Sequence, residues 1–257
     1  MSTLPALITI ADPGGLHPRE ATDLAASLQA QGIAVAAHRL PGAMELRFTP
    51  AGLTLNQEGG ESILVDFASD AFLYRLAKGG GRRQPMARAM GLKPGYSPLI
   101  LDATAGLGRD GFLLAALGCR VILCERSPIL CALLRDGLTR AAADPRLTAM
   151  VERITLQTGD SRHLLPALAC NERPEVISLD PMFPFRRKSA LVKKEMRLVR
   201  SLVGEDADTA ALLQVALIHA GKRVVCKRPS QAPPLNGPEP DFAITTPKHR
   251  FDVYLRR

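Results

Sequence analysis

From Gly95 onward, short β-like runs alternate with segments of helix-forming composition. The β-like runs, rich in branched apolar residues, are Leu99–Leu101, Val121–Cys124, Ile154–Leu156, Val176–Leu179 and Arg223–Cys226. The segments that favour helix are Phe112–Leu117, Ile129–Ala143, Leu164–Ala169 and Ala207–Ala220. Strands joined by helices pair in parallel, and the helices cover both faces of the sheet. The sequence therefore predicts an α/β fold, with a final strand or hairpin over Phe242–Thr245 and Phe251–Leu255 near one edge.

Residues 1–75 have a different pattern and predict a small N-terminal α+β lobe before a main domain of residues 76–257. One helix is expected near Glu20–Gln31. The β-like runs around it are Leu7–Ile10, Ile33–Ala37, Glu45–Phe48, Leu53–Asn56 and Ile63–Val65. The connector Lys78–Arg83 contains consecutive glycines followed by two arginines, so we expect it to be flexible and basic. Ser230–Pro240 holds four prolines and is expected to lack regular structure.

The charge and the cysteines narrow the classes of function. The 257-residue chain has a net charge of +8, which suits a polyanionic partner, although a basic surface alone can be without function. Its five cysteines lie in apolar runs without metal-ligand spacing, so we expect free thiols in a reducing compartment and no metal. No signal peptide is visible, and the most apolar stretch is too short to span a bilayer. We therefore expect a cytoplasmic protein without a membrane partner. We also expect the protein to be a monomer.

A glycine-rich loop follows the first strand of the main domain, in the stretch LDATAGLGRDGF. Its glycines fit the GxGxxG pattern of dinucleotide sites, where the start of the next helix faces a pyrophosphate. Asp102 and Asp110 would bring two carboxylates towards the same space and repel a pyrophosphate. They suit a ligand with an ammonium and a sulfonium, such as S-adenosylmethionine. The candidate cofactor residues in this loop are Asp102, Gly106, Gly108 and Asp110.

Two more acidic residues follow the next strands. Glu125 ends the second strand, where a carboxylate can accept hydrogen bonds from both ribose hydroxyls of either cofactor. Asp160 follows the third strand and would accept from the adenine amino group. Each has a structural alternative, since Asp110 or Asp160 could cap a helix and Glu125 could be a solvated strand end. Because open α/β sheets bind ligands at the carboxyl ends of their strands, these acids and the glycine loop together favour a methyltransferase.

The fourth strand leads into the segment LDPMFP. It is similar to the (Asp/Asn/Ser)-Pro-Pro-(Tyr/Phe) motif of methyltransferases that act on exocyclic amino groups of bases. Asp180 and the Pro181 carbonyl would accept the two N–H bonds of such a group, so that its lone pair is aimed at the methyl group. Phe183 would stack on the base, which contributes ~1–3 kcal/mol. These are the candidate catalytic residues; the alternative is an Asp-Pro turn with Phe183 in the core.

A strongly basic segment over residues 185–203 predicts an amphipathic helix. Glu195 interrupts its pattern and would pair with a neighbouring cation. A basic face beside a base-modifying loop suits phosphate contacts, and a solvated face is the alternative. The candidate RNA-binding residues are Arg186, Arg187, Lys188, Lys193, Lys194, Arg197 and Arg200, and the next candidates include Arg82 and Arg83.

Several segments together resemble the bacterial small-subunit ribosomal RNA methyltransferase J family: ATAGLGRD, CERSP, LDPMFP with KSALVKKEMR, and VCKRP with KHRFD. The resemblance covers about Asp66 to Tyr254. It implies a Rossmann-like class I S-adenosylmethionine-dependent methyltransferase fold and methylation of N2 of guanine 1516 in 16S ribosomal RNA. The family carries methionine in DPMF, as this chain does at Met182. By this resemblance the cofactor pocket is lined by Arg109, Asp110, Glu125, Arg126, Asp160, Ser161 and Asp180.

Three other functions stay open at this point. A DNA amino-methyltransferase would use the same chemistry, but the chain has no separate target-recognition domain of the usual size, so small-subunit ribosomal RNA or the 30S particle is the favoured partner. An NAD-dependent oxidoreductase would use the glycine loop differently. A non-catalytic RNA-binding protein is disfavoured by the intact Asp180-Pro-x-Phe183. The sequence does not distinguish naked RNA from an assembled subunit.

Overall fold

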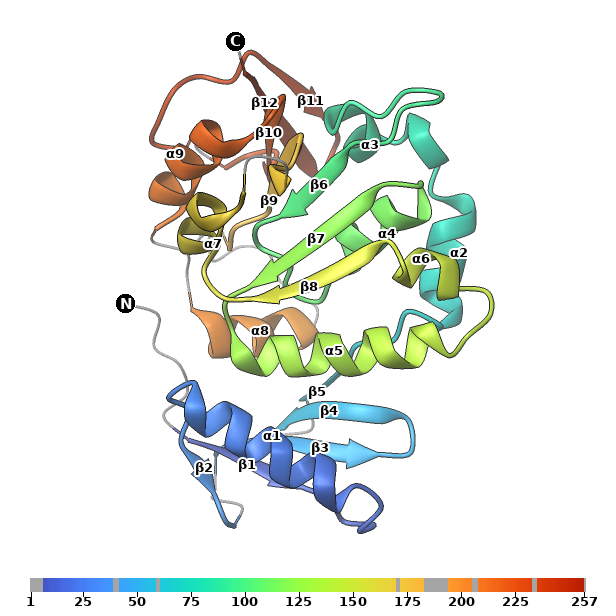
Figure 1. Ribbon diagram of the computed structural model, residues 1–257, viewed down its shortest axis with the longest axis vertical. Helices are drawn as coiled ribbons and strands as arrows, with labels where there is room; N and C mark the ends of the chain where they lie inside the picture. Colours follow the sequence, from blue (N-terminus) through green and yellow to red (C-terminus); the bar gives the residue numbers. More distant parts are fainter. Residues whose placement is uncertain are drawn as a thin grey trace.

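The computed structural model describes residues 7–38, 42–58, 61–169, 172–182, 194–204, 208–232 and 235–256. In these residues the chain forms a five-stranded and a seven-stranded sheet. Figure 1 shows the smaller sheet with its helix at one end of the molecule and the larger sheet with its helices at the other.

The small sheet comprises the first strands of the chain, in the order β2-β1-β3-β4-β5. Its elements are β1 (Ile8–Ala11), α1 (Pro18–Ala30), β2 (Val35–Ala36), β3 (Met44–Thr49), β4 (Gly52–Gln57) and β5 (Glu61–Leu64). β1 pairs in parallel with β2 and β3, and the other two pairs are antiparallel. The strands and the helix expected for the N-terminal lobe are therefore present.

The large sheet has the order β11-β12-β10-β9-β6-β7-β8. Its strands are β6 (Leu99–Asp102), β7 (Arg120–Glu125), β8 (Ile154–Thr158), β9 (Val176–Leu179), β10 (Arg223–Pro229), β11 (Phe242–Thr245) and β12 (His249–Leu255). The neighbouring strands β10, β9, β6, β7 and β8 are parallel to one another. At the edge beyond β10, β12 and β11 form an antiparallel hairpin. The predicted parallel sheet and its terminal hairpin are confirmed.

Helices cover both faces of the large sheet. They are α2 (Asp70–Lys78), α3 (Pro85–Ala89), α4 (Arg109–Ala116), α5 (Pro128–Ala142), α6 (Thr148–Val151), α7 (Ser161–Ala167), α8 (Lys194–Val203) and α9 (Thr209–His219), with the 3-10 helix η1 (Gly81–Arg83). One apolar core joins α3, α4, α5 and α8 to one face, and a second joins α7 and α9 to the other. Side chains alternate between the two cores along a strand, so Ile100 belongs to the first and Leu101 to the second.

The small sheet shares the first of these cores with the large sheet. Leu46 and Leu55 of the small sheet belong to the same apolar cluster as Leu133 of α5, and Figure 1 shows α5 between the two sheets. A Cβ on Gly137 of α5 would lie 2.7 Å from the Val65 carbonyl oxygen, so only glycine permits this close approach. The predicted boundary after residue 75 falls inside α2. The division into two domains stays a prediction.

The expectation of a flexible connector is wrong for its second half. Gly81–Arg83 forms η1, and the Arg82 guanidinium binds four acceptors from the segment before β6 and the end of α4. These are the carbonyl oxygens of Lys93, Tyr96 and Leu117 at 2.7, 2.8 and 2.7 Å and Ser97 Oγ at 2.6 Å. A guanidinium holds several acceptors in a fixed planar geometry, so it fixes a glycine-rich segment that composition alone describes as flexible.

Two expectations about the whole chain concern thiols and membranes. Cys119, Cys124, Cys131 and Cys226 are buried free thiols, as predicted, and burial raises the pKa of Cys124 to about 12. Cys170 lies outside the described residues. Within the described part of the chain, no helix combines the length and the apolar character needed to cross a membrane.

Candidate functional site

The order of the large sheet reverses at β6. The chain passes from β6 outward to β7 and β8 and then returns to β9 on the other side of β6. In open α/β sheets, ligands bind beyond the carboxyl ends of the strands at such a reversal, because the loops diverge there and leave a crevice.

A pocket of about 600 Å³, its open mouth included, lies at this position. Its polar lining comes from the carboxyl ends of β6, β7, β8 and β9, the segments that follow them and the start of α9: Thr104, Gly106, Glu125, Arg126, Asp160, Ser161, Arg162, Asp180, Asp208 and Thr209. Apolar side chains complete it: Leu130, Met182, Val199, Val203 and Leu212. Apolar walls with a few placed polar groups are typical of small-molecule and cofactor sites.

The glycines of the loop after β6 have different tasks. Gly106 and Gly108 have φ angles of +55° and +71°, in the left-handed region that favours glycine. Only Gly106 of the two lines the pocket. A Cβ on Gly108 would lie 2.6 Å from Leu134 Cδ1, and one on Gly111 would lie 2.3 Å from Leu123 Cδ2. Gly108 and Gly111 therefore permit the packing of α4, while Gly106 exposes its backbone to the pocket.

Glu125 is a buried carboxylate in the wall of the pocket, with an exposed fraction of 5%. Its Oε2 accepts a hydrogen bond from Gly106 N at 2.8 Å, and its Oε1 accepts one from Ser127 N at 2.7 Å. These bonds orient the side chain and tie the glycine loop to the end of β7. A carboxylate oxygen has more than one acceptor position, so this geometry fits a ribose whose two hydroxyls donate to Glu125.

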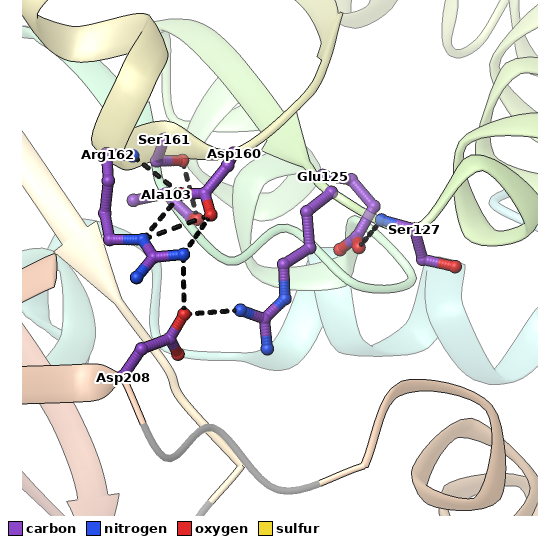
Figure 2. A network of polar contacts seen from close by, with 8 residues as sticks. Ala103, Glu125, Ser127, Asp160, Ser161, Arg162 and Asp208 are labelled. Carbon is purple, nitrogen blue, oxygen red and sulfur yellow. Dashed lines mark hydrogen bonds and ion pairs between the residues drawn. The ribbon is translucent and has the colours of Figure 1, made fainter. Parts of the chain in front are cut away.

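A chain of ion pairs crosses one side of the pocket, as Figure 2 shows. Arg162 Nη2 lies 2.5 Å from Asp160 Oδ2 and 2.9 Å from Asp208 Oδ2. Arg126 Nη1 lies 2.9 Å from the same oxygen of Asp208. Asp208 thus joins the N-terminus of α9 to the loops after β7 and β8.

Asp160 caps the N-terminus of α7, which was the structural alternative to a contact with the cofactor. It precedes α7, and its carboxylate accepts from Arg162 N at 2.8 Å. Hydrogen bonds from Arg162 lower the pKa of Asp160, so it stays ionised. Ser161 Oγ donates to the Ala103 carbonyl oxygen at 2.8 Å and joins the loops after β6 and β8. The predicted hydrogen bond from adenine to Asp160 stays a prediction.

A second ionic network joins α2, α4, β10 and the segment after β9. Asp110 Oδ1 lies 2.7 Å from Arg75 Nη2, and Asp110 Oδ2 lies 2.6 Å from Lys227 Nζ. Lys227 Nζ also lies 2.7 Å from Asp180 Oδ2. Burial opposes ionisation of Asp110, but Lys227 and Arg75 outweigh it and lower its pKa. Asp110 thus pairs with cations of the protein and is absent from the pocket lining; its predicted contact with the cofactor stays a prediction.

Asp102 lies at the end of β6 and is 5% exposed. Its Oδ1 accepts from Thr104 N at 3.3 Å. Burial, together with the negative charges of Asp110 and Asp180, raises the pKa of Asp102 to about 7. Asp102 does not line the pocket either, so a direct contact with the cofactor stays a prediction.

The basic helix is described only from Lys194 onward, as α8. Its Leu198, Val199, Leu202 and Val203 are buried, which confirms the predicted amphipathic pattern. Glu195 pairs with a cation as expected, but the partner is Arg109 of α4, at 2.6 Å. Arg197 is exposed and Arg200 partly exposed. The candidates that lie outside the described residues are Phe183, Arg186, Arg187, Lys188 and Lys193.

Several residues of the site were not predicted from the sequence. Lys227 carried a signal, because a lysine within an apolar strand is rarely buried unless acidic partners surround it. Nothing in the sequence marked Asp208 or Arg162 as residues of the site except their positions at the starts of helices. The pocket-lining side chains of α8 and α9, such as Val199 and Leu212, resemble ordinary core residues in the sequence. In the described part of the chain, no group of three or more His, Cys, Asp or Glu residues is placed to hold a metal ion.

Comparisons with known proteins show the family of this chain. A family model described as "Putative SAM-dependent methyltransferase" matches residues 32–256. The ribosomal RNA small subunit methyltransferase J of Pseudomonas aeruginosa is 51% identical over 209 residues, 80% of each chain. That of Aeromonas hydrophila is 55% identical over 195 residues, 76% of this chain and 78% of the relative.

A solved structure supports the same assignment. The crystal structure of a SAM-dependent methyltransferase from Neisseria gonorrhoeae has a TM-score of 0.74 and 34% sequence identity to this chain. The match covers 97% of this chain and 96% of that one. The Rossmann-like fold is therefore shown, and the chain belongs to the ribosomal RNA small subunit methyltransferase J family of S-adenosylmethionine-dependent methyltransferases.

Proposed function

We propose that this protein transfers a methyl group from S-adenosylmethionine to the exocyclic N2 of a guanine in small-subunit ribosomal RNA. The observation that carries this proposal is that Asp180, which begins the DPMF segment, lines the same pocket as the buried Glu125. A group that accepts from a base amino group thus lies beside a group that suits a ribose. The relatives, whose printed names specify small-subunit ribosomal RNA, support RNA over DNA as the substrate.

The residues of the pocket fit the cofactor. Glu125 would hold the ribose hydroxyls, and the Gly106 backbone would lie against the ligand. The apolar side chains of Leu130 and Leu212 suit the faces of the adenine ring, and Arg126 and Asp160 offer polar contacts at its edge. When bound, S-adenosylmethionine supplies a methyl group activated by the positive charge on sulfur.

The protein's part in the reaction is to position the acceptor amino group. Asp180 N donates to Thr104 Oγ1 at 2.7 Å, which fixes the start of the DPMF segment against the loop after β6. The Asp180 carboxylate and the Pro181 carbonyl would accept the two N–H bonds of guanine N2, whose lone pair is otherwise delocalised into the ring. Positioning of this kind supplies a large part of the rate in group transfer. N2 must finally lose one proton, which Asp180 or water takes.

The basic residues near the site would bind the RNA backbone. Phe183 would stack on the target base, and the cations of residues 186–200 would contact phosphates. If Arg197 makes such a contact, Arg197→Ala should flatten the plot of log affinity against log salt concentration by about 0.7 to 0.9. A merely solvated arginine leaves this slope unchanged.

The cellular setting is also an inference. We infer that the protein acts in the cytoplasm, as a monomer, on small-subunit ribosomal RNA or a 30S particle. Small-subunit RNA is the substrate that the relatives' names specify, and buried free thiols such as Cys124 and Cys226 fit a reducing compartment. Mass measurement in solution and methylation of RNA and of 30S particles in parallel test these statements.

Mapping of methylated bases in small-subunit RNA from cells with and without the protein tests the proposed function. A guanine N2 methyl group should disappear without the protein and return with the wild-type gene. Asp180→Asn should restore it partly and Asp180→Ala less, because asparagine keeps one acceptor oxygen. Unchanged methylation without the protein, or full activity of Asp180→Ala, would refute the proposal.

A further inference from the structure

Lys227 lies where three acidic residues from different elements converge. β10 pairs in parallel with β9, with Cys226 opposite Leu179, so Lys227 stands beside Asp180 at the strand ends. Side chains alternate along a strand, and Val225 belongs to the core beneath α4 while Cys226 belongs to the other core. The Lys227 side chain therefore reaches the α4 side of the sheet, where Asp110 lies.

The ammonium group of Lys227 bridges the proposed catalytic carboxylate and a second one. Its Nζ lies 2.7 Å from Asp180 Oδ2 and 2.6 Å from Asp110 Oδ2, and its side chain is only 19% exposed. Arg75 binds the other oxygen of Asp110 at 2.7 Å. Given the proposed function, we infer that Lys227 is a positioning residue for methyl transfer, which keeps the Asp180 carboxylate ionised so that it can accept a hydrogen bond from the amino group.

The local charges explain why a cation is needed there. Carboxylates held close together resist ionisation. Burial is the main reason that the pKa of Asp102 is raised to about 7, and the charges of Asp110 and Asp180 add to this shift. A protonated Asp180 would present an O–H donor where the amino group needs an acceptor. Burial opposes the charge of Lys227, but Asp180 and Asp110 outweigh it and raise the pKa of Lys227 above its ordinary value. The lysine is therefore a permanent cation at working pH.

Charged or titratable groups from several elements surround Lys227. Asp180 follows β9, and the others are Arg75 of α2, Asp102 of β6, Asp110 of α4 and His249 of β12. Burial and the charge of Lys227 lower the pKa of His249, so His249 is neutral near pH 7 and does not replace the lysine. Arg75 is bound to Asp110. Lys227, in contrast, contacts the Asp180 carboxylate directly.

The test compares Lys227→Met, Lys227→Gln and Lys227→Arg with the wild type. Single-turnover methylation is measured at saturating cofactor and RNA from about pH 6 to about pH 9. Near pH 7, Met and Gln should slow the reaction by about 10- to 100-fold, the rate equivalent of one charge-assisted hydrogen bond. The deficit should shrink as pH rises, because Asp180 then ionises without help. Arg keeps the charge and should stay within a few-fold of the wild type.

Lys222→Met is the matched control, because Lys222 precedes the same strand at its opposite end. It is also an ion-paired lysine, 2.7 Å from Glu175 Oε1, and it does not line the pocket. This variant should keep the wild-type rate and pH profile. If the Lys227→Met variant does not fold, Lys227→Gln, which keeps a polar side chain of similar length, carries the comparison.

A second measurement needs no activity and so separates this inference from the proposed function. In the cofactor-free protein with 13C-labelled aspartate, the Asp180 carboxyl signal is assigned from its loss in Asp180→Asn. It should titrate at higher pH in Lys227→Gln than in the wild type or in Lys222→Met. A wild-type titration and rate profile in Lys227→Gln would overturn the inference. An equal loss of rate at every pH would also overturn it, because a purely structural role predicts that result.

Discussion

Replacing Glu125 by glutamine should weaken cofactor binding without removing a heavy atom from the pocket. Both oxygens of the carboxylate accept backbone N–H groups, Oε2 from Gly106 and Oε1 from Ser127, at 2.8 and 2.7 Å. A glutamine has one oxygen and one NH₂ group. Whichever way the amide turns, its NH₂ faces one of these N–H donors, and a hydroxyl of the ligand loses its charged acceptor.

The loss of affinity is found by comparing the cost of the substitution in the free protein with its cost in the cofactor-bound protein. The N–H group left without an acceptor costs about 1–3 kcal/mol, but it does so in the free and the bound protein alike, so this cost lowers stability rather than affinity. Affinity falls by the lost bond between the carboxylate and a ribose hydroxyl, about 1.5–3 kcal/mol, or about 10- to 150-fold in Kd. Glu125→Ala loses both ribose contacts and should raise Kd by more than about 100-fold.

Titration calorimetry with S-adenosylmethionine gives the affinity, and urea unfolding of the free protein gives the stability. Glu152→Gln is the control, because Glu152 is an exposed glutamate that does not line the pocket. It should change neither quantity. Wild-type affinity in a folded Glu125→Gln protein would refute the assignment of the ribose to this carboxylate.

Three other predictions concern Arg82, Asp208 and Asp102. Arg82→Ala should lower the free energy of unfolding by about 2–4 kcal/mol, while Arg83→Ala, at an exposed neighbour, should change it by less than about 0.5 kcal/mol. Asp208→Asn should weaken cofactor binding measured by calorimetry by about 3- to 30-fold, since it releases the pocket-lining Arg126. Folding raises the pKa of Asp102 from 3.8 to about 7, so the native state binds the extra proton. Relative to Asp102→Asn, the wild type should therefore lose up to about 4 kcal/mol of unfolding free energy between pH 4 and pH 7 in urea titrations.

The strands of the large sheet were predictable because a strand buried on both faces is a continuous apolar run. Val121–Cys124 and Val176–Leu179 are such runs, and each belongs to a strand with a neighbour on both sides. The short α3 and α6 were not predicted, since a helix of one or two turns leaves too little periodicity. The regular structure of η1 was not predicted, because the partners of Arg82 are mainly backbone carbonyls, which every residue has.

The acids of the site were predictable for a different reason. Glu125, Asp160 and Asp180 each follow a strand, and the carboxyl ends of parallel strands meet at one edge of the sheet. Their partners were not predictable, because ion pairs such as Arg109 with Glu195 join residues far apart in the chain. Asp110 shows the limit of reasoning from local sequence. Its place at the start of α4 suggested a ligand contact, yet both its oxygens bind cations of the protein.

Under the proposed function, the two ionic networks would divide the site into a part that binds the cofactor and a part that positions the acceptor. Asp208, Arg126 and Arg162 all line the pocket, so their charges would act on a bound cofactor directly. Lys227 and Asp110 do not line it; Lys227 contacts Asp180 directly, and Asp110 contacts Lys227. Substitutions in the first network should therefore change cofactor affinity more than the rate at saturation. Those in the second should change the rate more than the affinity, because their effect passes through the group that orients the acceptor nitrogen.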